Sequence, residues 1–181
     1  VELALQLPLP ERATVVDLGT GTGAIALALA SERPHWQVVA VDAAEGAVAL
    51  AEANRQQLGF DNVVVLQSDW FEQLDGQTFD LVVSNPPYIE AGDRHLSEGD
   101  VRFEPASALV SGSSGLVDLA RIIDEAPHHL HSGGWLLLEH GWQQGEKVRQ
   151  LMLATGFVEV ATHNDLAGRE RATLGRWPVS G

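Results

Sequence analysis

The chain has 181 residues, no cysteine and a formal net charge of −14. This length fits one domain with a real core, and no apolar run approaches the roughly 20 residues of a membrane span. The acidic balance disfavours binding to a nucleic-acid backbone, and the lack of cysteine excludes disulfides and thiolate metal sites, as is typical of cytoplasmic proteins.

A glycine-rich turn dominates the first part of the chain. After a helix-like stretch at residues 1–6, an apolar strand at 13–18 runs into this turn, and an alanine- and leucine-rich helix follows from Ala24 to about Glu32. Glycines let a ligand approach the backbone, and a helix amino terminus offers free N–H groups. The turn reads Asp17-Leu18-Gly19-Thr20-Gly21-Thr22-Gly23. Its spacing differs from that of dinucleotide enzymes, and its acid would repel a pyrophosphate but could bind an amino group. The pattern favours S-adenosylmethionine over NAD.

The second predicted strand, residues 37–41, ends at Asp42. An acid at the end of the second strand, about 20 residues beyond the glycines, is placed to hold a ribose diol. The alternative is that Asp42 caps the predicted helix at residues 43–58. With the glycine turn beside it, we favour ribose binding.

The third predicted strand, residues 63–67, leads into Ser68-Asp69-Trp70-Phe71. Aromatic rings at a strand's carboxyl end can hold an adenine, and Asp69 can accept a hydrogen bond from the adenine amino group. The alternative is that Trp70 and Phe71 only pack under the sheet.

The fourth predicted strand, residues 78–84, ends in Asn85-Pro86-Pro87-Tyr88. Two prolines stop the strand and stiffen the turn. An amide or exocyclic amino nitrogen carries two N–H donors, which the Asn85 side-chain oxygen and the Pro86 carbonyl can accept, while Tyr88 lies against a flat substrate. The alternative is a structural turn with a capping asparagine and a packed tyrosine.

The rest of the chain completes the predicted sheet. The connection at residues 89–112 is long enough to suggest a lid or substrate clamp, or else a surface excursion pinned by Phe103. We expect a helix from Ser113 to about Leu130, with His128, His129 and His131 as surface residues rather than a metal cluster. A strand at 135–139, a helix at 141–155, and strands at 157–162 and 171–177 follow. The pattern predicts a doubly wound, mainly parallel α/β sheet that finishes in an antiparallel hairpin.

Together these stretches resemble the Rossmann-like, seven-stranded class I S-adenosylmethionine-dependent methyltransferases, and more narrowly the peptide chain release factor glutamine methyltransferases. The resemblance spans nearly the whole chain. The Asn-Pro-Pro-Tyr turn is shared with nucleic-acid amino methyltransferases. The segment Arg102-Phe103-Glu104-Pro105, which follows soon after it, narrows the resemblance to the release factor enzymes. The remaining stretches that carry it are Asp17 to Leu27, Gln67 to Phe71, and Leu138-Glu139-His140-Gly141.

The resemblance implies methyl transfer from S-adenosylmethionine, leaving S-adenosylhomocysteine, to the glutamine of the Gly-Gly-Gln tip of class I release factors. We expect no metal, and a monomer that contacts neither nucleic acid nor membrane. We expect residues 1–181 to be the catalytic domain, without the family's amino-terminal substrate-docking domain. The alternatives are a nucleic-acid amino methyltransferase and a non-catalytic cofactor-binding subunit. Carried over by motif, the cofactor residues are Asp17, Gly19, Thr20, Gly21, Thr22, Gly23, Asp42, Asp69, Trp70 and Asn85; the substrate residues are Asn85, Pro86, Pro87 and Tyr88, of which Asn85, Pro86 and Tyr88 are catalytic.

Overall fold

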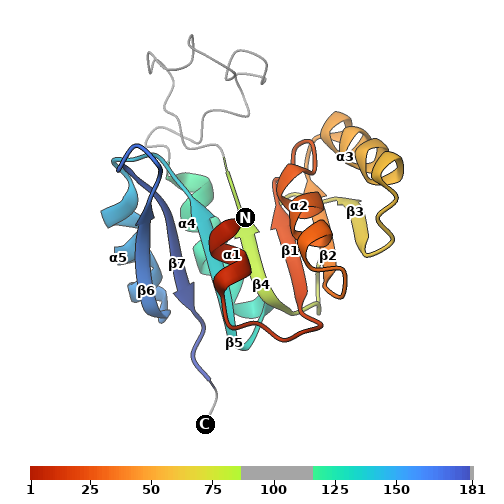
Figure 1. Cartoon of the computed structure of the whole chain (residues 1–181). Helices are drawn as coiled ribbons and strands as arrows, with labels where there is room; N and C mark the ends of the chain where they lie inside the picture. Colours follow the sequence, from red (N-terminus) through yellow and green to blue (C-terminus); the bar gives the residue numbers. More distant parts are fainter. Residues whose placement is uncertain (87–115, 180–181) are drawn as a thin grey trace.

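The computed structural model describes residues 1–86 and 116–179, which form a seven-stranded sheet (Figure 1). The strand order is β3-β2-β1-β4-β5-β7-β6. Strands β1 to β5 pair in parallel, and β7 lies antiparallel between β5 and β6. This confirms the predicted doubly wound sheet with a carboxyl-terminal hairpin. The strands are β1 (Thr14–Leu18), β2 (Gln37–Asp42), β3 (Val63–Gln67), β4 (Phe79–Ser84), β5 (Leu130–Glu139), β6 (Val158–Asn164) and β7 (Glu170–Arg176).

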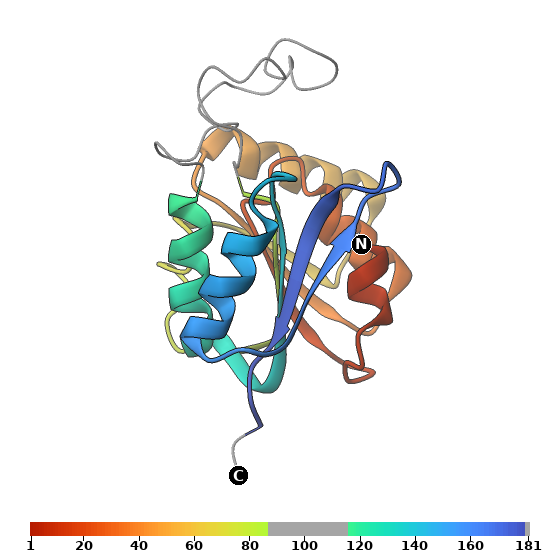
Figure 2. The same ribbon diagram turned by 90° about the vertical axis from the view of Figure 1, so that its left-hand side faces the viewer.

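Helices cover both faces of the sheet (Figure 2). One core joins α1 and α2 to alternate strand residues such as Val15 and Leu81, and the other joins α4 and α5 to Val16 and Leu136. Helix α3 packs on β2 and β3. In the described part of the chain no helix is long and apolar enough to span a membrane. The helices are α1 (Glu2–Gln6), α2 (Ala24–Glu32), α3 (Glu45–Leu58), α4 (Val117–Glu125), the short 3-10 helix η4 (Ala126–His129) and α5 (Gly145–Thr155).

The strand order changes direction between β1 and β4. The chain moves outward from β1 to β2 and β3, then returns to place β4 on the other side of β1. The register pairs Leu18 with both Val41 and Ser84, and Ser84 with Leu138, so the carboxyl ends of these four strands are level. Open α/β sheets bind ligands outside the strand ends at such a switch point. The glycine turn and Asn85 therefore flank the expected place.

Several predicted boundaries were wrong. Helix α3 begins at Glu45, two residues late, and α5 begins at Gly145 rather than at 141. Helix α4 ends at Glu125, because Pro127 has no N–H to continue the α-helical pattern, and β5 then begins at Leu130, five residues early. The serines expected to start this helix and the connection at residues 89–112 lie outside the described residues.

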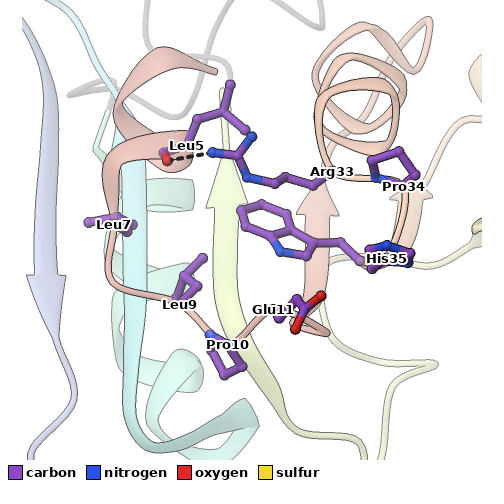
Figure 3. Close-up of a pocket in the computed structure, with 9 residues that line it drawn as sticks. Leu5, Leu7, Leu9, Pro10, Glu11, Arg33, Pro34 and His35 are labelled. Atoms are coloured by element: carbon purple, nitrogen blue, oxygen red, sulfur yellow. Dashed lines mark hydrogen bonds between the residues drawn. The ribbon is translucent and has the colours of Figure 1, made fainter.

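A pocket lies at the opposite end of the strands, between the segment after α1 and the turn from α2 to β2 (Figure 3). The Arg33 guanidinium donates to the Leu5 carbonyl oxygen at 3.1 Å and lies 5.8 Å from the Trp36 ring centroid. These contacts fasten the amino-terminal segment to the sheet. Because Trp36 and Pro10 precede β2 and β1, this pocket is remote from the switch point and belongs to the framework.

Candidate functional site

The glycine turn after β1 has a left-handed backbone. Gly19, Gly21 and Gly23 have φ values of +67°, +57° and +84°, which side-chain-bearing residues rarely adopt. The Thr20 N–H donates to the Val41 carbonyl oxygen at 2.8 Å, which ties the turn to the end of β2. A Cβ at Gly21 would meet no heavy atom within 4 Å, so the space beside this glycine is open. The turn can therefore receive a ligand against its backbone.

Asp17 is buried beneath this turn. Its Oδ2 accepts hydrogen bonds from Thr20 Oγ1 at 2.6 Å and from the Ala26 N–H at 3.2 Å. Its Oδ1 is buried and has no hydrogen-bond partner among the described residues. Burial raises the pKa of Asp17 from 3.8 to about 7, and the nearby Asp42 adds to the rise, while the bonds from Thr20 and Ala26 oppose it. An unpartnered acceptor with a raised pKa suits a ligand that brings a positive charge or N–H donors.

Asp42 joins the glycine turn to the start of α3. Its Oδ2 accepts from the Gly21 N–H and its Oδ1 from the Ala44 N–H, both at 2.9 Å. The residue that caps α3 is Ala44, so the predicted alternative of Asp42 as the helix cap was wrong. Each of the two carboxylate oxygens of Asp42 can still accept a second hydrogen bond. The ribose role of Asp42 stays a prediction.

Trp70 lies over the glycine turn. A Cβ at Gly19 would come within 3.2 Å of Trp70 Cζ3, and Trp70 itself has a left-handed φ of +49°. The Trp70 side chain is hydrogen-bonded to Asp118 of α4, whose pKa is raised, chiefly by burial. Phe71 points into the core and stacks on His129 with ring centroids 4.4 Å apart. The packing alternative therefore holds for Phe71, and Trp70 also packs partly against this core while its ring lies beside Gly19.

Asp69 and the histidines differ from expectation in their partners. The Asp69 carboxylate is half exposed and pairs with Arg121 of α4 at 3.0 Å. Arg121 lies 52 positions after Asp69 and Asp118 lies 48 positions after Trp70, so no local pattern links them and both were missed. His129, predicted to be a surface residue, is buried by Phe71. Within residues 1–86 and 116–179, no three His, Cys, Asp or Glu side chains are grouped as a metal site.

Asn85 follows β4 at the switch point. The Ser84 hydroxyl donates to the Leu18 carbonyl oxygen at 2.7 Å, which ties the ends of β4 and β1 together. Asn85 is exposed, while Ser84 and Pro86 on either side of it are buried. The predicted substrate residues Pro87 and Tyr88 lie outside the described residues. The structure thus presents the Asn85 amide to solvent from a fixed backbone beside the glycine turn.

These features fit a cofactor that has an amino-acid part and a nucleoside part. The unpartnered Asp17 Oδ1 suits the amino group, the open face of Gly21 admits a close backbone contact, and Trp70 offers an aromatic surface. Asp42, which pairs with Gln67 at the end of β3, lies between the glycine turn and that strand end. The described residues therefore accommodate S-adenosylmethionine, and their individual roles remain predictions.

The chain is similar in sequence to curated methyltransferases. It is 63% identical over 177 residues to "Release factor glutamine methyltransferase" of Pseudomonas aeruginosa, a match that covers 98% of this chain and 64% of the relative. It is 56% identical over 170 residues to the protein of the same name in Escherichia coli, covering 93% of this chain and 61% of the relative. The predicted resemblance is confirmed. The chain spans somewhat less than two thirds of the length of these relatives.

Solved structures of methyltransferases share the fold. A methyltransferase from Pyrococcus furiosus aligns with a TM-score of 0.76 at 17% identity, over 98% of this chain and 81% of that one. A SAM-dependent methyltransferase from Aquifex aeolicus aligns with a TM-score of 0.67 at 17% identity, over 97% and 87% of the two chains. The fold is thus that of the class I methyltransferases. The model of the methyltransferase small domain matches residues 2–113, and the chain belongs to this family.

Proposed function

We propose that this protein transfers a methyl group from S-adenosylmethionine to the side-chain amide nitrogen of the glutamine in the Gly-Gly-Gln tip of class I release factors, in the cytoplasm. The observation that carries the proposal is the position of Asn85, exposed at the end of β4 and next to the glycine turn. The shared name of relatives at 63% and 56% identity supports the choice of substrate. We further propose that residues 1–181 make up the cofactor-binding and catalytic domain, acting as a monomer.

On the cofactor side, the proposed roles follow from where the motif residues lie, at and after the carboxyl ends of β1, β2 and β3. Gly19 to Gly23, with Thr20 and Thr22, would hold the methionine part, and Asp17 would meet its amino group with the free Oδ1. Asp42 would bind the ribose hydroxyls, Trp70 the adenine face, and Asp69 the adenine amino group. The cofactor supplies an electrophilic methyl group on a sulfonium. The protein has to hold that group in line with the nucleophile.

On the substrate side, Asn85 and Pro86 would aim the glutamine nitrogen. An amide nitrogen is a poor nucleophile because its lone pair is delocalised into the carbonyl. Two acceptors on its N–H groups shift electron density to the nitrogen and fix its direction, and orienting two reactants can contribute about 7–11 kcal/mol. Pro87 and Tyr88 would form the flat wall of the substrate site. The proton leaves after transfer, from a nitrogen that has become strongly acidic, so no general base is needed first.

Charge favours a protein substrate over a nucleic acid. The chain carries 25 acidic and 11 basic side chains. Arg55, Arg121, Arg149, Arg171 and Arg176 are each in salt bridges with acidic residues. A phosphate backbone requires cationic groups that are available to it. We therefore rank the nucleic-acid amino methyltransferase below the release factor enzyme.

Asn85→Ala tests the proposed role of the turn. The variant should keep its cofactor affinity within a few-fold, while the turnover rate falls about 100-fold. The reason is that the variant lacks the side-chain oxygen that orients the glutamine nitrogen during methyl transfer. Asn85→Asp keeps two acceptors and should retain part of the activity. Asn164→Ala, at an exposed asparagine at the end of β6, is the matched control. Mass spectrometry of a release factor measures the transfer, and full activity of Asn85→Ala would remove Asn85 from catalysis.

A further inference from the structure

A line of side-chain hydrogen bonds joins α5, β6, β7 and the end of β5. Arg149 donates from its guanidinium to Thr162 Oγ1 at 2.8 Å, and Thr162 Oγ1 lies 2.8 Å from Thr173 Oγ1. Thr173 Oγ1 lies 2.8 Å from His140 Nε2, and His140 Nδ1 lies 2.9 Å from the Gly141 carbonyl oxygen. The elements that supply these residues lie side by side in Figure 2. The proposed chemistry uses none of these side chains.

When the His140 ring is neutral, the two ends of this line fix the direction of every bond in it. The Gly141 carbonyl can only accept, so His140 Nδ1 carries a hydrogen, and in a neutral imidazole Nε2 is then the acceptor. Thr173 must donate to Nε2, so Thr162 donates to Thr173. Arg149 can only donate, and it donates to Thr162. For a neutral His140, one arrangement therefore satisfies all four contacts, and in it the ring is protonated on Nδ1.

Burial favours this neutral form. His140 and Thr173 are both 0% exposed. Burial lowers the pKa of His140, Arg171 and Arg149 lower it further, and Glu170 and the Gly141 carbonyl oppose the change. A Cβ at Gly145 would collide with the Glu170 carboxylate and lie 3.2 Å from His140 Cε1. A side chain at this position would therefore make the Glu170 carboxylate move and would press on the His140 ring.

The ring holds a turn at the same edge of the sheet as Asn85. Leu138 pairs with Ser84, so Glu139 to Gly141 leave β5 beside the turn that follows β4. The Gly141 carbonyl accepts from both His140 and the Gln144 N–H, and the Gly141 N–H donates to Gln144 Oε1, each at 2.9 Å. This closed turn contains Trp142, whose side chain is 50% exposed. Tryptophan is a frequent anchor of protein interfaces, so an exposed tryptophan here is a candidate contact for a protein.

We propose that His140 is a positioning residue, which through its neutral, Nδ1-protonated ring holds the Gly141–Gln144 turn so that Trp142 contacts the protein substrate. The inference rests on the proposed function for its partner. The cofactor groups lie on β1, β2 and β3, on the other side of β4. Disturbing the line should therefore weaken the use of the protein substrate and leave cofactor binding unchanged.

Thr173→Val removes the hydroxyl while keeping the shape of the side chain, and Thr155→Val, at the far end of α5, is its matched control. For a purified class I release factor, kcat/KM should fall about tenfold in Thr173→Val and in Trp142→Ala, mainly through KM. The Kd for S-adenosylhomocysteine should stay within about two-fold in both. Trp142→Ala is a surface change, so it remains informative if Thr173→Val fails to fold. An unchanged KM in Trp142→Ala would overturn the contact.

Nitrogen-15 NMR of the histidine rings tests the line without any activity. His140, assigned from its absence in His140→Gln, should show a protonated Nδ1 and a bare Nε2, and should stay neutral at about pH 6.5, the ordinary midpoint of a histidine. In Thr173→Val the Trp142 indole resonance should shift, and in Thr155→Val it should not. A protonated Nε2, or an unmoved Trp142 resonance, would overturn the positioning role. If the wild type methylates no release factor but these NMR results hold, the proposed substrate fails and the tautomer assignment stands.

Discussion

Asp17 makes the stability of this protein depend on pH in a direction that is unusual for a carboxylic acid. Its pKa rises from 3.8 to about 7 on folding, mainly because the side chain is buried. Between these values the unfolded chain has lost the Asp17 proton and the folded chain still holds it. At about 1.4 kcal/mol per pH unit, the contribution of Asp17 to the free energy of unfolding should fall by about 4 kcal/mol as pH rises from about 4 to about 8.

Asp17→Asn isolates this contribution, because asparagine does not titrate. The amide leaves a constant packing cost, but the difference in unfolding free energy between variant and wild type should move in favour of the variant by about 4 kcal/mol from pH 4 to pH 8. Urea unfolding followed by circular dichroism at several pH values measures it. Thr20→Val removes a bond that favours the carboxylate, so it should move the pH dependence to higher pH. A difference that does not change with pH would refute the buried, protonated Asp17.

Three further predictions concern the site. Gly21→Ala and Gly59→Ala each place an alanine in a left-handed backbone with open space around its Cβ, so each should cost about 1–2 kcal/mol of stability in urea unfolding. Only Gly21→Ala should also abolish cofactor binding in calorimetry, and equal cofactor affinities of the two variants would refute the close approach at Gly21. Asp42→Ala should weaken cofactor binding by roughly 1–3 kcal/mol, with Glu45→Ala as the neighbouring control, and unchanged affinity would remove Asp42 from the ribose role. Tyr88→Phe should keep most of the turnover and Tyr88→Ala should lose most of it, whereas a Phe variant as inactive as the Ala variant would mean that the hydroxyl matters.

The sequence predicted the sheet well because its strands are short apolar runs that end in sharply different residues. Asp42 and Asn85 each mark a strand end within one residue, and the glycines at 19, 21 and 23 have the left-handed backbone that the turn requires. The helix boundaries were less accurate. The helix expected from residue 141 is delayed to Gly145 because Gly141 and Gln144 close a turn with two local bonds, and the Gly141 carbonyl oxygen also contacts the His140 ring.

The side-chain partners within the site could not be predicted for a physical reason. Asp69 pairs with Arg121 and Trp70 with Asp118, and both pairs join the segment that follows β3 to α4, which is distant in the sequence. The stacking of Phe71 on His129 is likewise a contact between distant segments. The unpartnered Oδ1 of Asp17 is also a property of the folded core, since a sequence shows an acid before a glycine turn but not its burial.

The most direct test is to incubate the natural full-length protein with S-adenosylmethionine and a class I release factor, and to locate the added methyl group by tandem mass spectrometry. A second release factor, with the glutamine of its Gly-Gly-Gln tip changed to glutamate, serves as the control. Our account predicts one methyl group on the glutamine side chain and none on the control. Methylation of another residue, equal methylation of the control, or no transfer to the release factor would contradict it.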